Sequence, residues 1–228
     1  MKMKDLFCTL SLFLGLLALP LPGRAQNPDS LLREAAARDQ QVRMRLLEMN
    51  RRVNGGEYSA ALVDSLVAAG AEMERIDREN MRLVASLLRD GLPEGLAAES
   101  YDAVWLIIDH ASLKEQKKFL PLLREAAGRG VISAYKLATL EDRVAMYEER
   151  PQRCGTQSYQ TNVGGETVIY IWPVAHPERL DSLRGSIGTC PMAEYVRLLE
   201  ETSGARVVCD PALTVDSLKR IVGKKALF

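Results

Sequence analysis

The sequence predicts a mainly α-helical protein: a helical array of about five long helices, then a small late β-hairpin and short C-terminal helices. Apolar residues recur at intervals of three and four over long stretches between residues 28 and 149. Turns that contain glycine and proline separate these stretches. The 228 residues are 47% hydrophobic and 26% charged, which excludes a disordered or collagen-like chain and allows a sizeable core.

Five long helices are predicted at residues 28–53, 59–89, 96–111, 113–127 and 132–149. The first begins at Asn27-Pro28, where an amide side chain that can cap a helix precedes a proline that fits the first turn. The second is expected either to continue through Gly70 or to break there. Turns at residues 54–56, 91–93 and 128–130, and Pro151, mark helix ends.

After Pro151 the hydrophobic pattern changes from helical to strand-like. Residues 156–161 and 167–172 are short β-type runs, and the Asn-Val-Gly-Gly sequence between them predicts a hairpin turn. Three shorter helices are expected at residues 177–186, 191–201 and 214–222. Residues 26–228 are therefore expected to form a single helical domain, with the β-hairpin inserted near residues 154–173.

Residues 1–25 predict a secretory signal peptide. Lys2 and Lys4 precede a nearly unbroken apolar run at residues 6–19, and Gly23-Arg24-Ala25 places small residues where a signal peptidase reads them. The run is shorter than the roughly 20 residues that cross a bilayer, so no transmembrane span is expected after cleavage. An uncleaved anchor is the alternative. We therefore expect an exported protein, either periplasmic or secreted.

The charge balance excludes nucleic acid as a partner. Thirty basic residues face thirty acidic ones, so no long-range field attracts the chain to DNA or RNA. Aromatic residues make up only 6% of the chain, which argues against a surface that stacks on bases or sugars.

Three cysteines follow the signal sequence: Cys154, Cys190 and Cys209. Export permits a disulfide, and a bond from Cys190 to Cys209 would close a loop worth up to about 3 kcal/mol in the entropic model. The odd number leaves one thiol over, and the sequence does not decide which. The plainer interpretation is three unpaired, small apolar side chains.

Polar residues interrupt the apolar faces of four predicted helices. Asp39 interrupts the first helix and Asn80 the second, His110 follows the apolar face of the third, and Asp142 interrupts the fifth. An unpaired buried carboxylate costs several kcal/mol, so each needs a partner or a water-lined space. We expect one shared pocket that contains these residues and their charged neighbours: Asp39, Arg43, Asp77, Asn80, His110, Asp142 and Arg143.

Structural explanations compete with this hypothesis. A single polar residue in a helical seam often only fixes the register of the helices. Asp39 and Arg43, one turn apart, form an ordinary surface pair if that face is exposed. His110 lies at a helix end, where its side chain can cap the last carbonyls. Together the four interruptions could also form a buried structural network without a ligand.

Motifs along the chain resemble a known family. In order they are D-Q-x-x-R at Asp39, D-x-x-N at Asp77, G-x-P at Gly91, His110, Gln116, L-A-x-L-x-D-R at Leu137, Q-x-x-G-T-Q at Gln152, R-x-x-x-G at Arg184 and Tyr195. Over residues 36–200 they resemble a family of uncharacterised bacterial proteins, often exported, that is known only as a domain of unknown function. The resemblance implies no activity.

The resemblance overlaps the residues found by spacing and adds Gln40, Gln152, Thr156 and Gln157 to them. The last three lie at the entrance of the hairpin, which is expected either to cover the helical pocket or to form a hydrogen-bonded turn. The chain departs from the family pattern at Asp109, where Gln is usual, and at Cys154, where Tyr is usual. The candidate site residues are Asp39, Gln40, Arg43, Asp77, Asn80, His110, Asp142, Arg143, Gln152, Thr156 and Gln157.

Recognisable cofactor chemistry is missing from the sequence. The two histidines are not spaced as zinc ligands on a helix, so no metal is expected. No phosphate loop, dinucleotide-binding motif or nucleophile elbow occurs, so no cofactor is expected. We therefore favour a non-catalytic binding or interaction module, whose polar cleft between helices takes a small polar ligand, a peptide or an envelope protein. The alternative is a metal-independent hydrolase or lyase that uses Asp/His acid–base chemistry.

Overall fold

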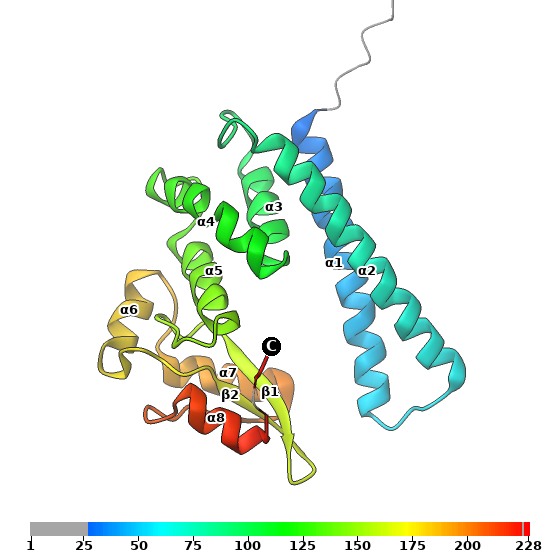
Figure 1. Cartoon of the computed structure of the whole chain (residues 1–228), viewed down its shortest axis with the longest axis vertical. Helices are drawn as coiled ribbons and strands as arrows, with labels where there is room; N and C mark the ends of the chain where they lie inside the picture. The colour runs from blue at the N-terminus through cyan, green and yellow to red at the C-terminus, as the bar shows by residue number, and fades with distance from the viewer. Residues whose placement is uncertain (1–26, 225) are drawn as a thin grey trace, which may run out of the picture.

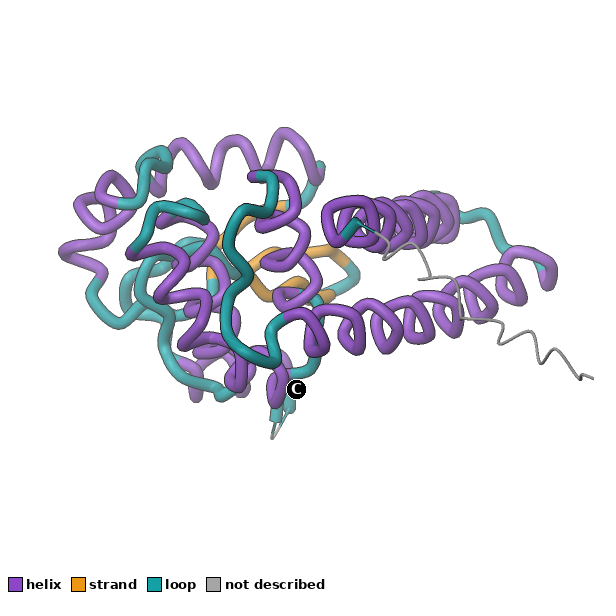
Figure 2. Tube along the Cα trace, turned by 90° about the horizontal axis from the view of Figure 1, so that it is seen from above, coloured by secondary structure: helices purple, strands orange, loops and turns teal. Residues whose placement is uncertain are grey.

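The computed structural model describes residues 27–224 and 226–228 and confirms the predicted fold class. Helices make up most of this part of the chain, and a small three-stranded sheet lies late in the sequence (Figures 1 and 2). The signal peptide predicted at residues 1–25 lies outside the described residues.

A long antiparallel hairpin of two helices forms one side of the molecule. Helix α1 spans Pro28–Asn54 and helix α2 spans Ala60–Leu87. The Asn27 side chain accepts a hydrogen bond from the Asp29 backbone N–H, which caps α1 as the sequence predicts. Helix α2 continues through Gly70 without a break. Figure 1 shows this hairpin as a long arm beside the remaining elements.

Three shorter helices complete the main core: the first packs against both helices of the hairpin, and the other two pack against the first and against each other. Helices α3, α4 and α5 span Ala98–Asp109, Leu113–Gly128 and Ala134–Tyr147. Each of the five helices places at least one apolar side chain in this core, and these residues include Leu32, Val84, Ile108, Leu123 and Leu140. The 3–4 spacing of apolar residues therefore buries one face of every long helix.

The late sheet contains one strand more than the sequence predicts. Strands β1 (Ser158–Val163) and β2 (Glu166–Ile171) form the expected antiparallel hairpin around Gly164 and Gly165. A third strand, β3 (Arg206–Val208), pairs parallel to β2. Three residues are too few to show an alternating pattern, so spacing alone does not reveal β3.

Short helices cover both faces of the sheet. A 3-10 turn at Pro177–Arg179 leads into α6 (Leu180–Ser186), followed by α7 (Met192–Ser203) and α8 (Val215–Val222). One small core contains Trp172 of the segment after β2 and Leu218 of α8, and another contains Ile169 of β2 and Met192 of α7. Successive β2 side chains point to opposite faces, so this strand is buried on both sides.

The three cysteines of the described residues are unpaired. Cys154 is buried, Cys190 is half-buried and Cys209 is exposed, and all three are free, as in the plainer of the two interpretations.

Across residues 27–224 and 226–228, none of the helices combines the length and the apolar character that crossing a membrane requires.

We expect Gly155→Ala to destabilise the protein more than Gly164→Ala does. Both glycines have a positive φ, +67° and +61°, so alanine strains the backbone at either site. A Cβ at Gly155 would also collide with Met192 Cε and approach Leu180 Cδ1 to 3.2 Å, whereas a Cβ at Gly164 meets open space. Urea unfolding should show an additional loss of about 1 kcal/mol or more for Gly155→Ala. Equal losses would mean that this turn is loosely packed.

Candidate functional site

Four of the predicted residues meet between α1, α2 and the end of α3. Arg43 Nη1 donates to Asp39 Oδ1 at 2.8 Å, and Arg43 Nη2 donates to both oxygens of Asp77 at 2.9 and 3.1 Å. His110 Nδ1 lies 2.8 Å from Asp39 Oδ2. We call these residues, Asp39, Arg43, Asp77 and His110, the Asp39 cluster.

Local sequence places each member of the Asp39 cluster. Asp39 and Arg43 are one turn apart on α1, so their side chains lie on the same face. Helix α3 ends at His110, whose backbone N–H donates to the Leu106 carbonyl, and Ser112 begins α4 two residues later. The His110 side chain does not cap α3; it crosses to α1 and meets Asp39.

The Asp39 carboxylate is the most enclosed group of the cluster. It is 1% exposed, yet both of its oxygens are paired: Oδ1 with Arg43, and Oδ2 with His110 and with Gln40 Nε2, which donates at 3.2 Å. These charge-assisted hydrogen bonds offset the cost of burying the charge. A carboxylate only accepts hydrogen bonds, so His110 Nδ1 is the donor, and a neutral His110 ring keeps a lone pair on Nε2.

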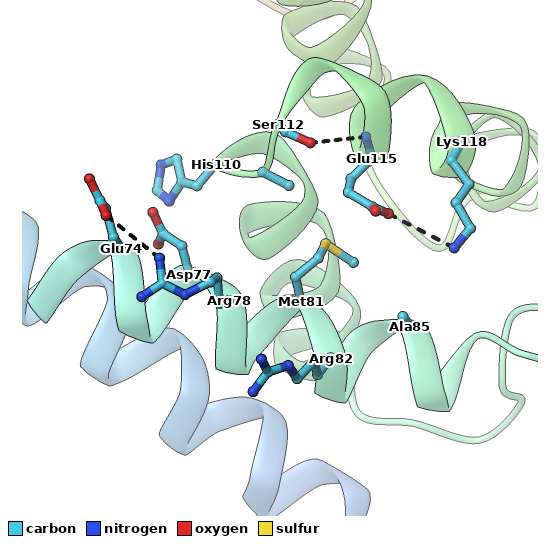
Figure 3. A pocket seen from close by; sticks show the side chains of 11 residues that line it. Glu74, Asp77, Arg78, Met81, Arg82, Ala85, His110, Ser112, Glu115 and Lys118 are labelled. Atoms are coloured by element: carbon cyan, nitrogen blue, oxygen red, sulfur yellow. Dashed lines mark hydrogen bonds and ion pairs between the residues drawn. The ribbon is translucent and has the colours of Figure 1, made fainter. Parts of the chain in front are cut away.

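A pocket of about 490 Å³ opens beside this cluster, between α2 and the turn from α3 to α4. Figure 3 shows Glu74, Asp77 and His110 at one end, Met81 in the middle, and Glu115 and Lys118 at the other end. The side chains of His110 and Asp77 are 20% and 26% exposed, so both reach solvent while Asp39 stays behind them. The cluster therefore forms one polar end of an open pocket.

Most residues of this pocket were not among the sequence candidates. Besides Asp77 and His110, its lining consists of Glu74, Arg78, Met81, Arg82, Ala85, Ala111, Ser112, Glu115 and Lys118. Charged residues on an exposed helix face look the same in sequence whether or not another helix faces them. Only the position of the α3–α4 turn across from α2 makes them neighbours.

Arg143 pairs with Asp109, a residue that the sequence analysis noted only as a departure from the family pattern. Arg143 Nε donates to Asp109 Oδ1 at 2.9 Å. Burial raises the pKa of the Asp109 carboxyl, while the positive charges of Arg143 and Arg43 and the neighbouring His110 oppose that rise. The signal that could have identified Asp109 is its place beside His110, at the end of an apolar helix.

Asp142 and the hairpin-entrance residues form a separate cluster, which contradicts the expected single pocket. Asp142 accepts hydrogen bonds of 2.7–3.2 Å from the backbone N–H groups of Arg153, Cys154 and Thr156 and from the Thr156 hydroxyl. Gln152 Nε2 donates to the carbonyls of Gln157 and Trp172. We call Asp142, Gln152, Thr156 and Gln157 the Asp142 cluster.

The Asp142 cluster holds a turn in place. Burial raises the pKa of the Asp142 carboxyl, although four hydrogen-bond donors favour its charged form. Gln157 Nε2 donates to the Thr139 carbonyl of α5, so the turn before β1 is fixed to that helix. None of the cluster's residues lines the 490 Å³ pocket, so the hairpin entrance does not cover it. The hydrogen-bonded turn is the interpretation that fits.

The remaining candidate, Asn80, joins the two helices of the hairpin. Its side chain is 1% exposed, and Nδ2 donates to the Ala35 carbonyl of α1 at 3.1 Å. It lies one turn after Asp77 on α2 but makes no hydrogen bond to the Asp39 cluster among the described residues. Asn80 therefore fixes the register of α1 and α2, which is one of the structural roles considered for it.

Cys154 is poorly suited to be a nucleophile. Burial and the nearby Asp142 carboxylate raise the pKa of its thiol to about 11, so it stays protonated at neutral pH. Arg184, itself buried, donates to the backbone carbonyls of Cys154 and Gly155 from α6. Arg184 occurred in the sequence only as part of the family motif, and the structure gives it this role in positioning the turn.

Comparison with known proteins identifies a family but no function. A model described as "Family of unknown function (DUF6624)" matches residues 31–208, which is most of the chain. No curated protein and no solved structure matches the chain.

We expect the contribution of Asp109 to stability to fall as the pH rises. Because burial raises its pKa in the folded state above the ordinary value of about 3.9, the folded protein binds this proton more tightly than the unfolded chain does. The advantage in unfolding free energy of wild type over Asp109→Asn should therefore be largest near pH 3 and shrink towards pH 6. Urea titrations of both proteins at each pH measure it. An advantage that grows with pH would show that Arg143 outweighs burial.

Proposed function

We propose that this chain, which belongs to the family of unknown function DUF6624, is a binding protein that holds a small polar ligand or peptide in the pocket beside His110. The observation that carries the proposal is the orientation of a pocket-lining histidine by a carboxylate buried behind it. A buried carboxylate that fixes one ring nitrogen leaves the other to meet a ligand.

The dimensions and lining of the pocket support this proposal. Its volume of about 490 Å³ lies in the range of about 300–1,000 Å³ that is usual for small-molecule sites. The flexible Met81 side chain and the small Ala85 and Ala111 side chains give apolar contact, while His110 and Lys118 offer polar groups at opposite ends. Such a mixture suits a ligand with both apolar and polar parts.

A purely structural network explains the Asp39 cluster less well. A network that only fixes helix register is enclosed by the helices that it joins. Here Asp39 is enclosed, but His110 and Asp77 both line an open pocket. The Asp142 cluster shows the contrasting case, because each oxygen of its carboxylate is used within the turn.

The second candidate is a metal-independent hydrolase or lyase, and the 2.8 Å contact between Asp39 Oδ2 and His110 Nδ1 favours it. With Nδ1 held as donor, Nε2 of a neutral His110 can take a proton from a bound substrate. Arg78 or Arg82 at the pocket wall could stabilise a developing negative charge. Asp142 is committed to the turn, so it is not part of this scheme.

We also propose that the protein acts outside the cytoplasm, in the periplasm or after secretion. The support for this location is the sequence of residues 1–25, with its basic start, apolar run and small residues at the expected cleavage position. A ligand would then be one that is present in the cell envelope or the surroundings.

Blocking the pocket should abolish ligand binding. Acetate, inorganic phosphate and tetra-alanine serve as probes, and amide chemical shifts of Ala111 and Ser112 in ¹H–¹⁵N NMR spectra report binding. We expect at least one probe to shift these amides in wild type but not in Ala85→Trp, whose indole ring fills the pocket. Ala68→Trp, on the exposed face of α2 outside the pocket, is the matched control and should respond like wild type. A response of Ala85→Trp that equals wild type, or no response to any probe, would refute the proposal.

Catalysis would be revealed by turnover of a bound probe. We expect the enzyme candidate to convert tetra-alanine or a related ester to products detectable by mass spectrometry, and His110→Gln to lower the rate about 100-fold or more, because glutamine cannot take the proton. His176→Gln, which changes the exposed histidine far from the pocket lining, is the control and should leave the rate unchanged. Binding without any product in wild type would remove the enzyme candidate and leave the binding function.

A further inference from the structure

A buried glutamine of α4 holds the turn that carries His110. The Gln116 side chain is fully buried, and its Nε2 group donates to the Asp109 carbonyl at 2.8 Å and to the Ala111 carbonyl at 3.1 Å. Asp109 and Ala111 flank His110 in the chain, so one amide group joins α4 to the backbone on both sides of the histidine. Gln116 belongs to the motifs that resemble the family, yet it does not line the pocket.

Both carbonyls lie where the backbone needs outside donors. The last four carbonyls of a helix have no partner within that helix. Asp109 is the last residue of α3, and Ala111 lies in the turn before α4. A glutamine side chain carries two N–H donors on one nitrogen, so Gln116 serves both carbonyls at once. The turn is thereby fixed to the first turns of α4, whose own backbone begins at Leu113.

The oxygen of the same amide shows that Gln116 is not arranged for stability alone. Gln116 Oε1 is buried and has no hydrogen-bond partner among the described residues, which costs free energy. Gln152 of the Asp142 cluster is buried in the same way, and its Nε2 also bridges two carbonyls. Its Oε1, however, accepts from the Gln157 backbone N–H at 2.9 Å. Gln152 is satisfied at both ends, whereas Gln116 leaves one end unpaired.

The position of the turn decides where the His110 ring lies. His110 Nδ1 is 2.8 Å from Asp39 Oδ2, and Asp39 belongs to α1, a different element from the turn. Hydrogen bonds weaken steeply when the distance grows or the angle bends, so a shift of the turn separates the ring from the carboxylate. The contact with Asp39 is what holds the proton on Nδ1 and leaves Nε2 as an acceptor at the pocket (Figure 3).

We infer that Gln116 is a positioning residue of the pocket: by holding the Asp109 and Ala111 carbonyls, it keeps the His110 ring against Asp39 with Nε2 free to meet a ligand. The inference rests on the proposed binding function and adds to it a residue that does not line the pocket. Gln116 acts through His110, so its loss changes the state of the ring as well as the affinity for a ligand.

Nitrogen NMR of the histidine rings tests the inference, because the chain has only two histidines and the exposed His176 is a reference in the same spectrum. At about pH 8.5, where an ordinary imidazole is neutral, we expect the His110 ring of wild type to carry its proton on Nδ1. Gln116→Met removes both donors and should shift the proton mainly to Nε2. It should also weaken about tenfold or more the binding of whichever of acetate, inorganic phosphate and tetra-alanine wild type binds.

Two further variants separate positioning from a general loss of stability. Gln152→Met removes the same two donors from a buried glutamine outside the pocket, so it is the matched control and should leave the His110 ring and the probe affinity as in wild type. Gln116→Asn keeps the amide but is one methylene shorter, so it cannot span both carbonyls. It should behave like Gln116→Met, and it provides the test if the methionine variant does not fold.

Different failures of this experiment point to different conclusions. A proton on Nε2 in wild type, or a His110 ring that keeps its proton on Nδ1 in the Gln116 variants, would overturn the inference. So would an unchanged probe affinity in these variants, or an equal change of the ring in Gln152→Met. If the ring responds as expected but wild type binds none of the three probes, the proposed binding function falls, and the hold of Gln116 on the His110 ring is confirmed.

Discussion

A carboxylate buried between helices must find donors, and this requirement constrains how α1, α2 and the end of α3 meet. Asp39 is satisfied by Arg43 on its own helix and by His110 at the end of α3. Arg43 then reaches Asp77 on α2, so one chain of polar contacts joins three helices. Because α2 and the α3–α4 turn are the two walls of the pocket, the same contacts that satisfy Asp39 also set the shape of the site.

Helical periodicity made much of this predictable. A helix repeats every 3.6 residues, so a polar residue on an apolar stripe is turned inwards whatever it meets there, and this reasoning found Asp39, Asn80, His110 and Asp142 from spacing alone. The long helices were predicted to within a few residues for the same reason. Strand β3 was not predicted, because three residues are too few to show a period. Arg78, Arg82 and Lys118 were not identified as pocket residues, because charged residues that line a pocket look in sequence like those of any solvated helix face.

Spacing predicts which side chains point inwards, but it does not predict which interior they enter. Asp39 and Asp142 interrupt their helices in the same way, yet one supports a pocket-lining histidine and the other receives the backbone of a turn that follows Pro151. Asp142 finds its donors in the segment that begins eleven residues later, whose path depends on tertiary packing. Arg143 likewise turns towards Asp109, which no periodic argument had singled out.

The parallel pairing of β2 with β3 has a consequence for how the C-terminal half folds. It joins Val168 to Arg206, and both α6 and α7 lie between these residues in the chain. Contacts so distant in sequence form slowly, because the intervening chain must be ordered first. Until β3 arrives, β2 presents an unpaired edge of consecutive apolar residues, the kind of edge that associates with other chains. Once β3 is paired, this edge of β2 is covered, so three residues close the side of the sheet that would otherwise stay open.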